Sequence, residues 1–194
     1  MLILISREKT IELMSEIYFR FLKTLPFDDD LYMGGMREGR TKFLSNLNTE
    51  IIRKFFDRSK QDWRYTSDYV SQRALELLKP GKWEKGSLIF EHIVPKTKHI
   101  RDICEEEAKK YFLNQDNNFS EQFIYNCLND CYWTATIHKD ENAKLSKNSM
   151  PIGWKAGDDI FARYRDTQNI EKLIIDLIPH DRTYCLPQSK LRVK

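Results

Sequence analysis

The sequence contains no apolar run that approaches the ~18 residues of a membrane-spanning helix. The opening Met-Leu-Ile-Leu-Ile is too short for the apolar core of a secretory signal, and charged residues follow it at once. Hydrophobic residues make up 41% of the chain and charged residues 31%, which is typical of soluble globular proteins. We therefore expect a cytoplasmic protein that does not associate with a membrane.

Paired cysteines and nucleotide-binding motifs are also missing. The four cysteines form no Cys-x-x-Cys pair, so a structural zinc ribbon is not expected. They stand mostly in apolar patterns, which favours reduced thiols that are buried as small hydrophobic residues. The chain lacks a P-loop, a Gly-x-Gly-x-x-Gly and a Gly-x-Ser-x-Gly stretch, so we expect no nucleotide cofactor.

Helical periodicity dominates the first 80 residues. Apolar residues at helical spacing predict one helix from Ile11 to Leu25, a second after Thr49, and a third that contains Val70 and ends before Pro80-Gly81. Two more helices are expected over residues 97–113 and after Ser120, which can act as an N-cap. No repeat or low-complexity linker interrupts the chain, which favours one domain.

An acid stands beside a histidine at the end of an apolar run, in the stretch Glu91-His92-Ile93-Val94-Pro95-Lys96. A carboxylate can bind a hard cation such as Mg²⁺. A neutral imidazole, with an ordinary pKa of about 6.5, can take a proton from water. Metal-assisted hydrolysis needs both groups. The alternative is a strand end whose histidine only caps a loop.

A second polar cluster, residues 138–145, follows the strand-like residues 131–137. If a helix starts near Lys139, His138 and Asn142 lie one turn apart and face the same side, which suits two ligands of one ion. Asp140 and Glu141 would then fall in the first turn, where the helix dipole favours carboxylates, so these two acids are equally well explained as helix-start charges.

The stretch Glu91-His92-Ile93-Val94-Pro95, together with the later Asp140-Glu141-Asn142, resembles the HNH, or ββα-metal, endonuclease family. The resemblance implies a core of two strands and one helix around a single divalent ion, Mg²⁺ or alternatively Mn²⁺. It implies that Glu91 is a metal ligand, that His92 is the general base, and that Asn142 is the metal ligand on the helix. His138 would be a further metal ligand, as in family members with a His-x-x-x-His helix.

Two features differ from the family's pattern. The stretch between the two motif halves, residues 96–132, is longer than the family's loop and has helical periodicity, so a helical insertion is expected. The family's middle asparagine, which braces the loop behind the catalytic histidine, has Asn126 and Asn129 as its candidates.

The predicted fold class is α+β: a mainly helical single domain that surrounds a small ββα-metal core. Within it we expect a helical layer over residues 1–80, the core over residues 82–147 with the helical insertion at about 97–130, and a C-terminal extension over residues 148–194.

The distribution of basic residues is more informative than the net charge of +3. Lys96 follows the first motif and Lys144 lies in the second, so we expect both to contact nucleic-acid phosphates. Arg163 and Arg165 either reach phosphate or pair with acids such as Asp159. Residues 33–40 hold three of the seven glycines and two arginines, and form either an ordinary turn or a flexible loop that contacts DNA.

The function that the resemblance implies is hydrolysis of phosphodiester bonds in double-stranded DNA, with 5′ phosphates on the products. The size and the helical surroundings suggest a restriction-type enzyme that acts as a homodimer. One alternative is an RNA-cleaving or toxin-like nuclease. Another is a non-enzymatic helical module that binds nucleic acid or protein. His99 and His180 lack an adjacent ligand residue and are expected to be structural.

Overall fold

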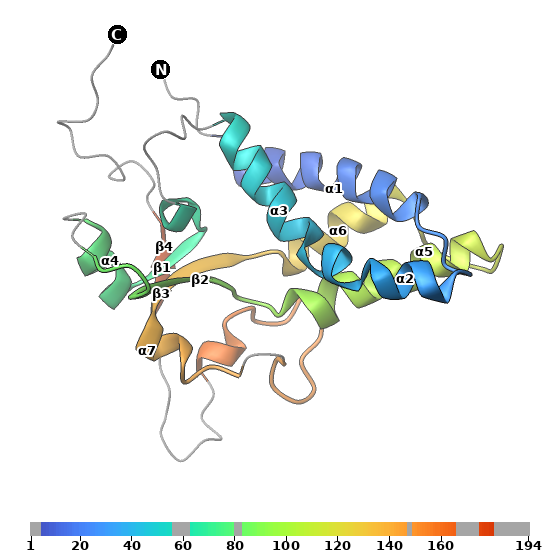
Figure 1. Cartoon of the computed structure of the whole chain (residues 1–194). Coiled ribbons are helices and arrows are strands. Elements are labelled where there is room, and N and C mark those ends of the chain that lie inside the picture. The colour runs from blue at the N-terminus through green and yellow to red at the C-terminus, as the bar shows by residue number, and fades with distance from the viewer. Residues whose placement is uncertain (1–4, 56–62, 80–82, 147–148, 166–174, 181–194) are drawn as a thin grey trace, which may run out of the picture. The chain divides into compact units, whose positions relative to one another are not determined.

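The computed structural model describes residues 5–55, 63–79, 83–146, 149–165 and 175–180 (Figure 1). The fold is α+β, as predicted: helices accompany a small four-stranded mixed sheet. The chain forms two compact units. The helical unit consists of Met1–Phe56 and Pro95–Tyr132, and the sheet unit consists of Asp57–Val94 and Trp133–Lys194.

The helical unit is built from amphipathic helices whose apolar stripes pack against one another. Its elements are α1 (Arg7–Lys23), α2 (Asp30–Gly35), α3 (Arg37–Phe55), η3 (Thr97–Arg101), α5 (Asp102–Phe112) and α6 (Glu121–Cys131). Helix α1 packs against α3, α5 and α6 and buries Ile11, Met14, Tyr18 and Leu22. Each such side chain contributes about 1.5–3 kcal/mol on burial, so the stripe stabilises the whole unit.

Serine caps start α1 and α6. The Ser6 hydroxyl accepts a hydrogen bond from the Lys9 N–H (3.1 Å), and the Ser120 hydroxyl accepts one from the Phe123 N–H (3.1 Å). Each bond satisfies a backbone donor that has no partner inside the helix. The helices predicted from Ile11 and after Ser120 are confirmed as α1 and α6. The helix predicted over residues 97–113 is confirmed as η3 followed directly by α5.

The three described cysteines are free thiols within this unit. Cys104 and Cys131 are buried and Cys127 is half-buried, while Cys185 lies outside the described residues. Burial raises the pKa of the Cys131 thiol to about 12. The prediction of buried, apolar cysteines is confirmed for Cys104 and Cys131.

Helix α3 is much longer than predicted, because it begins at Arg37 instead of after Thr49. Residues 33–40 are the end of α2 and the start of α3. The Met36 N–H donates to the Tyr32 carbonyl (2.9 Å) and the Arg40 N–H donates to the Met36 carbonyl (2.8 Å). The two helices therefore meet at a one-residue junction. The glycines at positions 34, 35 and 39 concealed this arrangement, since glycine disfavours helix interiors.

The sheet unit holds four strands in the order β2-β3-β1-β4. Strand β2 (Leu88–His92) pairs antiparallel with β3 (Thr134–His138), β3 pairs parallel with β1 (Tyr69–Ser71), and β1 pairs antiparallel with β4 (Leu177–Pro179). The helical elements are η2 (Trp63–Thr66), α4 (Gln72–Leu78), α7 (Lys139–Asn142) and η4 (Ala162–Arg165). Val70, which was predicted to be helical, lies in β1, and α4 begins only after it.

Alternate residues of the strands enter two separate apolar clusters. One cluster contains Ile93, Ala135, Ile137, Leu145, Tyr164 and Ile175. We call this side of the sheet the Glu91 face, because Glu91 is the cross-strand partner of Ala135. The other cluster contains Val70, Ala74, Leu75, Leu78 and Leu88. We call that side the His92 face, because His92 lies four positions after Leu88 on β2 and side chains two or four positions apart share a face.

The division of the chain into two units differs from the predicted order of helical layer, core and extension. Residues 97–130, predicted as an insertion, belong with the N-terminal helices, because α1 packs against both α5 and α6. Helix α4, predicted as part of the N-terminal helical layer, belongs with the sheet. Part of the predicted C-terminal extension supplies η4 and the edge strand β4. Among the described residues, no helix has the length and apolar character needed to cross a membrane.

Candidate functional site

The two sequence motifs lie on neighbouring strands. Glu91 and His92 end β2, directly opposite Ala135 and Thr134 of β3, and His138 ends β3 opposite Leu88. Strand β2 is at one edge of the described sheet. Glu91 and His92 are consecutive strand residues, so their side chains point to opposite faces of the sheet.

On the Glu91 face, a buried arginine holds the Glu91 carboxylate. Arg163 Nη2 lies 2.7 Å from Glu91 Oε1 and also donates to the His92 carbonyl (2.6 Å), while Nη1 donates to the Ser146 carbonyl (2.7 Å). The side chain of Arg163 is 2% exposed and that of Glu91 is 22% exposed. A buried guanidinium requires such partners, because desolvating an unpaired charge is costly. We call these contacts the Arg163 clamp.

Two alternatives were predicted for Arg163 and Arg165, namely contact with phosphate or pairing with an acid. Arg163 pairs with an acid, and so does Arg165, whose Nη1 lies 3.1 Å from Asp159 Oδ2. The sequence placed Arg163 near Asp159, so its actual partner, 72 positions away, could not be identified from local spacing.

The side chains of His138 and Glu141 cap the N-terminus of α7. His138 Nδ1 accepts the Asp140 N–H (3.2 Å), and Glu141 Oε2 accepts both the His138 N–H (2.8 Å) and the Ser71 hydroxyl (2.6 Å). Asp140 pairs with Arg73 at 2.9 Å. The hydrogen bond from the Asp140 N–H therefore occupies His138 Nδ1, so this ring nitrogen is engaged by the helix start.

Asn142 ends α7, which is a single turn. The Lys139 N–H donates to the Ser87 carbonyl (2.9 Å), beside the beginning of β2. Farther along, Leu145 joins the apolar cluster that contains Ile93, and the Arg163 clamp connects the Ser146 carbonyl to Glu91. Residues 139–146 therefore run back along the Glu91 face from the beginning of β2 toward its end, and Asn142 lies on this return path.

His138 does not lie beside Glu91. Its cross-strand partner is Leu88, three residues before Glu91. At about 3.3 Å per strand residue, this separates the two positions by about 10 Å along β2. His138 is the N-cap of α7 and Asn142 its last residue, so the two positions lie one helical turn apart, as the sequence predicted.

On the His92 face, a row of polar residues crosses the sheet. Thr134, opposite His92, donates its N–H (2.9 Å) and its hydroxyl (2.8 Å) to Asp68 Oδ2. The Asp68 carbonyl in turn accepts the His180 N–H (2.9 Å). The row His92, Thr134, Asp68 and His180 thus draws one residue from each of four chain segments. The His92 ring meets Phe90 edge-on, with centroids 6.3 Å apart.

The hydroxyl of Ser67 connects this row to the next one. It lies 3.0 Å from His180 Nδ1 and 3.0 Å from the Thr136 hydroxyl, and both Ser67 and Thr136 are fully buried. His180 is itself 7% exposed, which agrees with the structural role predicted for it. No motif in the sequence predicted this row. The alternation of Thr134 and Thr136 with apolar residues was the one local signal of a polar strand face.

The predicted phosphate-binding lysines and the candidates for the middle asparagine are divided between the two units. Lys96 belongs to the helical unit, where its ammonium group donates to the Ser45 hydroxyl, whereas Lys144 is exposed in the sheet unit. The candidates for the middle asparagine also lie in the helical unit. Asn126 Oδ1 accepts from Gln122 (2.9 Å) and Asn129 Oδ1 accepts from Arg7 (2.9 Å).

Within the described part of the chain, no three or more His, Cys, Asp and Glu side chains are grouped to hold a metal ion. Glu91 and Asn142 offer carboxylate and amide oxygens. These are hard donors of the kind that Mg²⁺ prefers, so the donor chemistry fits magnesium better than zinc. Comparison of the chain with models of protein families, with curated proteins and with solved structures gave no match.

Proposed function

We propose that the chain is a divalent-metal-dependent endonuclease that hydrolyses phosphodiester bonds in double-stranded DNA. The path of the chain through β2, β3 and α7 carries this proposal. Two antiparallel strands are joined to a helical turn, and the chain then returns across the face that bears Glu91. This is the order of elements expected for a ββα-metal core, with the helical residues 97–130 between the two strands.

In this proposal, His92 accepts the proton of the attacking water. It is the last residue of β2, an edge strand of the described sheet. Because Glu91 points to the opposite face, the proposal requires the phosphodiester to lie across the end of this strand. Glu91 and Asn142 would hold the divalent ion, which when bound neutralises charge on the scissile phosphate and on the leaving oxygen. Arg163 is a positioning residue, because it fixes the Glu91 carboxylate and the His92 carbonyl together.

A second candidate function is a non-enzymatic module that binds nucleic acid. The observation that favours it is that Glu91, His138, Asp140 and Glu141 each already have a protein partner. In that case the Arg163 clamp would be purely structural. The two candidates differ in whether phosphodiester bonds are broken.

Incubation with supercoiled plasmid, with and without chelator, tests the proposal. We expect nicking and linearisation in Mg²⁺ or Mn²⁺, and none with excess chelator. Parallel reactions with duplex DNA, single-stranded DNA and RNA separate a DNA nuclease from an RNA-cleaving one. Stable DNA binding without cleavage in either metal would favour the binding module. Sedimentation with and without DNA tests the homodimer that a restriction-type enzyme would form on a symmetric site.

A further inference from the structure

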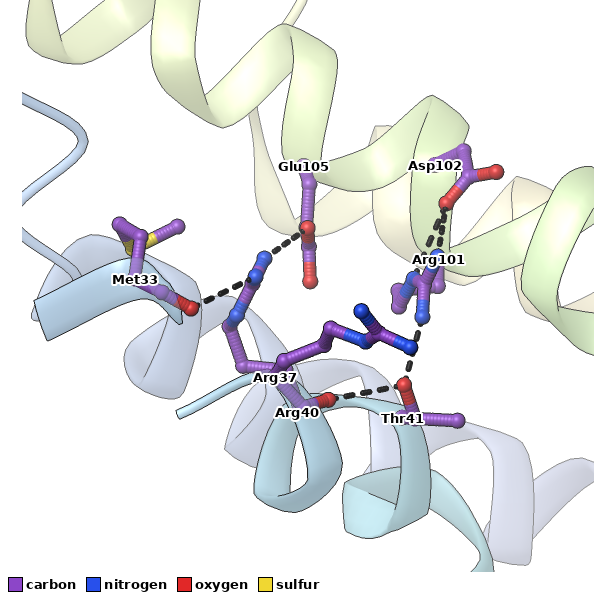
Figure 2. A network of polar contacts seen from close by, with 7 residues as sticks. All are labelled: Met33, Arg37, Arg40, Thr41, Arg101, Asp102 and Glu105. Atoms are coloured by element: carbon purple, nitrogen blue, oxygen red, sulfur yellow. Dashed lines mark hydrogen bonds and ion pairs between the residues drawn. The ribbon is translucent and has the colours of Figure 1, made fainter. Parts of the chain in front are cut away.

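Three arginines of the helical unit come together where α3 begins (Figure 2). Arg37 and Arg40 belong to the first turn of α3, and Arg101 ends η3. Arg40 forms an ion pair with Glu105 and donates to the Met33 carbonyl (3.0 Å). Its guanidinium is therefore fixed and largely buried, with 14% of the side chain exposed.

Arg101 is held by two partners, Asp102 and Thr41. Its Nε and Nη2 donate to Asp102 Oδ1 (2.9 and 2.6 Å), and its Nη1 donates to the Thr41 hydroxyl (2.6 Å). The Thr41 hydroxyl in turn donates to the Arg37 carbonyl (2.8 Å). A guanidinium has five N–H donors, so these contacts leave Arg101 with donors for another acceptor.

Arg37 is the surplus charge of this group. Asp102 and Glu105 are already paired with Arg101 and Arg40. Arg37 is exposed, and within the described part of the chain its guanidinium has no recorded hydrogen bond or ion pair. Since Arg37 and Thr41 are one turn apart, they share a face of α3. Figure 2 shows the Arg37 side chain extending toward the contact between Thr41 and Arg101.

The same face of α3 continues to a third cation. Ser45, one turn beyond Thr41, accepts a hydrogen bond from the Lys96 ammonium group. Positions 37, 41 and 45 follow one line along the helix, about 12 Å long at 1.5 Å per residue. We call the cations along this line, Arg37, Arg101 and Lys96, the α3 cation stripe.

We infer that the α3 cation stripe binds the sugar–phosphate backbone of DNA. A duplex carries one phosphate per ~3.4 Å of axis on each strand, so the stripe spans about three phosphates. Cations placed one helical turn apart suit a chain that repeats its negative charge, whereas a single phosphorylated side chain would engage one end of the stripe. Arginine can also bind a phosphate with two parallel hydrogen bonds.

The inference depends on the proposed function for the identity of the polyanion, but the binding itself requires no cleavage. It gives residues 33–40 a role that the sequence left open between a turn and a DNA contact. Arg37 is presented by a rigid helix start, which lowers the entropic cost of ordering it on DNA.

The test is fluorescence anisotropy of a labelled duplex of about 20 base pairs, with Ca²⁺ in place of Mg²⁺, across a salt series. We expect Arg37→Ala to weaken binding by roughly 3–10-fold and to lower the slope of log affinity against log salt by ~1. Arg37→Glu should weaken binding further, and Arg37→Lys should retain most of it. The matched control is Arg20→Ala, which removes an exposed arginine paired with Glu16 on α1.

Parent-like affinity of both Arg37→Ala and Arg37→Glu would overturn the inference, as would binding to anionic vesicles but not to duplex DNA. Failure of the inference is distinguishable from failure of the nuclease proposal. If plasmid is never cleaved but the Arg37 variants lose affinity, DNA binding by the α3 cation stripe is supported and the nuclease proposal is contradicted. If cleavage occurs and the Arg37 variants bind like the parent, the reverse holds.

Discussion

The two faces of the small sheet stabilise their polar groups in different ways. On the Glu91 face the polar groups are ionic: a nearly buried arginine is matched to one carboxylate and two carbonyls. On the His92 face they are hydroxyls and imidazoles in a row that includes the Asp68 carboxylate. Residues adjacent in sequence therefore work in separate environments, and the pair Glu91-His92 is not a pair of neighbouring side chains.

The largest change in stability is expected from the ionic face. Arg163→Met leaves the Glu91 carboxylate without its buried counter-charge, and breaking a buried pair by removing one partner costs about 3–5 kcal/mol. Urea unfolding followed by circular dichroism measures this loss. The control is Arg165→Met, whose pair with Asp159 is exposed and worth about 0–1 kcal/mol. Equal losses in the two variants would mean that the Arg163 clamp does not stabilise the sheet unit.

A smaller loss is expected on the His92 face. Thr134→Val keeps the shape of the side chain but removes the hydroxyl that donates to Asp68 and accepts the Asp68 N–H. Hydrogen bonds to a charged group are worth about 1.5–3 kcal/mol, so unfolding should require less urea by a corresponding amount. Thr134→Ser retains the hydroxyl and should recover most of the loss. A Thr134→Val protein as stable as the parent would contradict the claim that the hydroxyl row stabilises the His92 face.

Some of this architecture was predictable from the sequence. The α+β class, the helix from Ile11, the helix capped at Ser120 and a strand at the first motif all follow from local periodicity and capping residues, which are short-range signals. The Arg163 clamp and the row through Asp68 and His180 join residues many tens of positions apart. The order β2-β3-β1-β4 creates the row, whereas the contact of η4 with the end of β2 creates the clamp, and no local pattern encodes either arrangement.

The roles of individual site residues were harder to predict for the same reason. Asp140 and Glu141 were either part of the motif that resembles the nuclease family or helix-start charges, and the hydrogen bonds of Glu141 to the His138 N–H and to Ser71 favour the second interpretation. The alternation of Thr134 and Thr136 indicated a polar strand face, but its partners come from other strands. Capping residues are close in sequence to the helix ends that they cap, whereas cross-strand partners become neighbours only when the chain folds.

The smallest effect concerns a histidine outside the sheet. Burial, followed by the nearby Lys98, lowers the pKa of His99 below its ordinary value of 6.5. The folded state therefore disfavours protonated His99. Its contribution to stability is present above pH 6.5 and declines as the pH falls below that value. The urea midpoint should drop more between pH 7.5 and pH 5 in the parent than in His99→Gln, to a small extent because the ring is only partly buried. Identical pH profiles would contradict this prediction.

The most direct test of the central claim compares two histidine substitutions for plasmid cleavage in Mg²⁺ and Mn²⁺. Loss of a positioned general base costs ~10²–10⁴-fold in rate. We therefore expect His92→Ala to lose cleavage by that factor while its melting temperature and DNA affinity stay close to those of the parent, and His99→Ala to cleave normally. Cleavage at the parent's rate by both variants would contradict the assignment of His92 as the base of a metal-dependent nuclease.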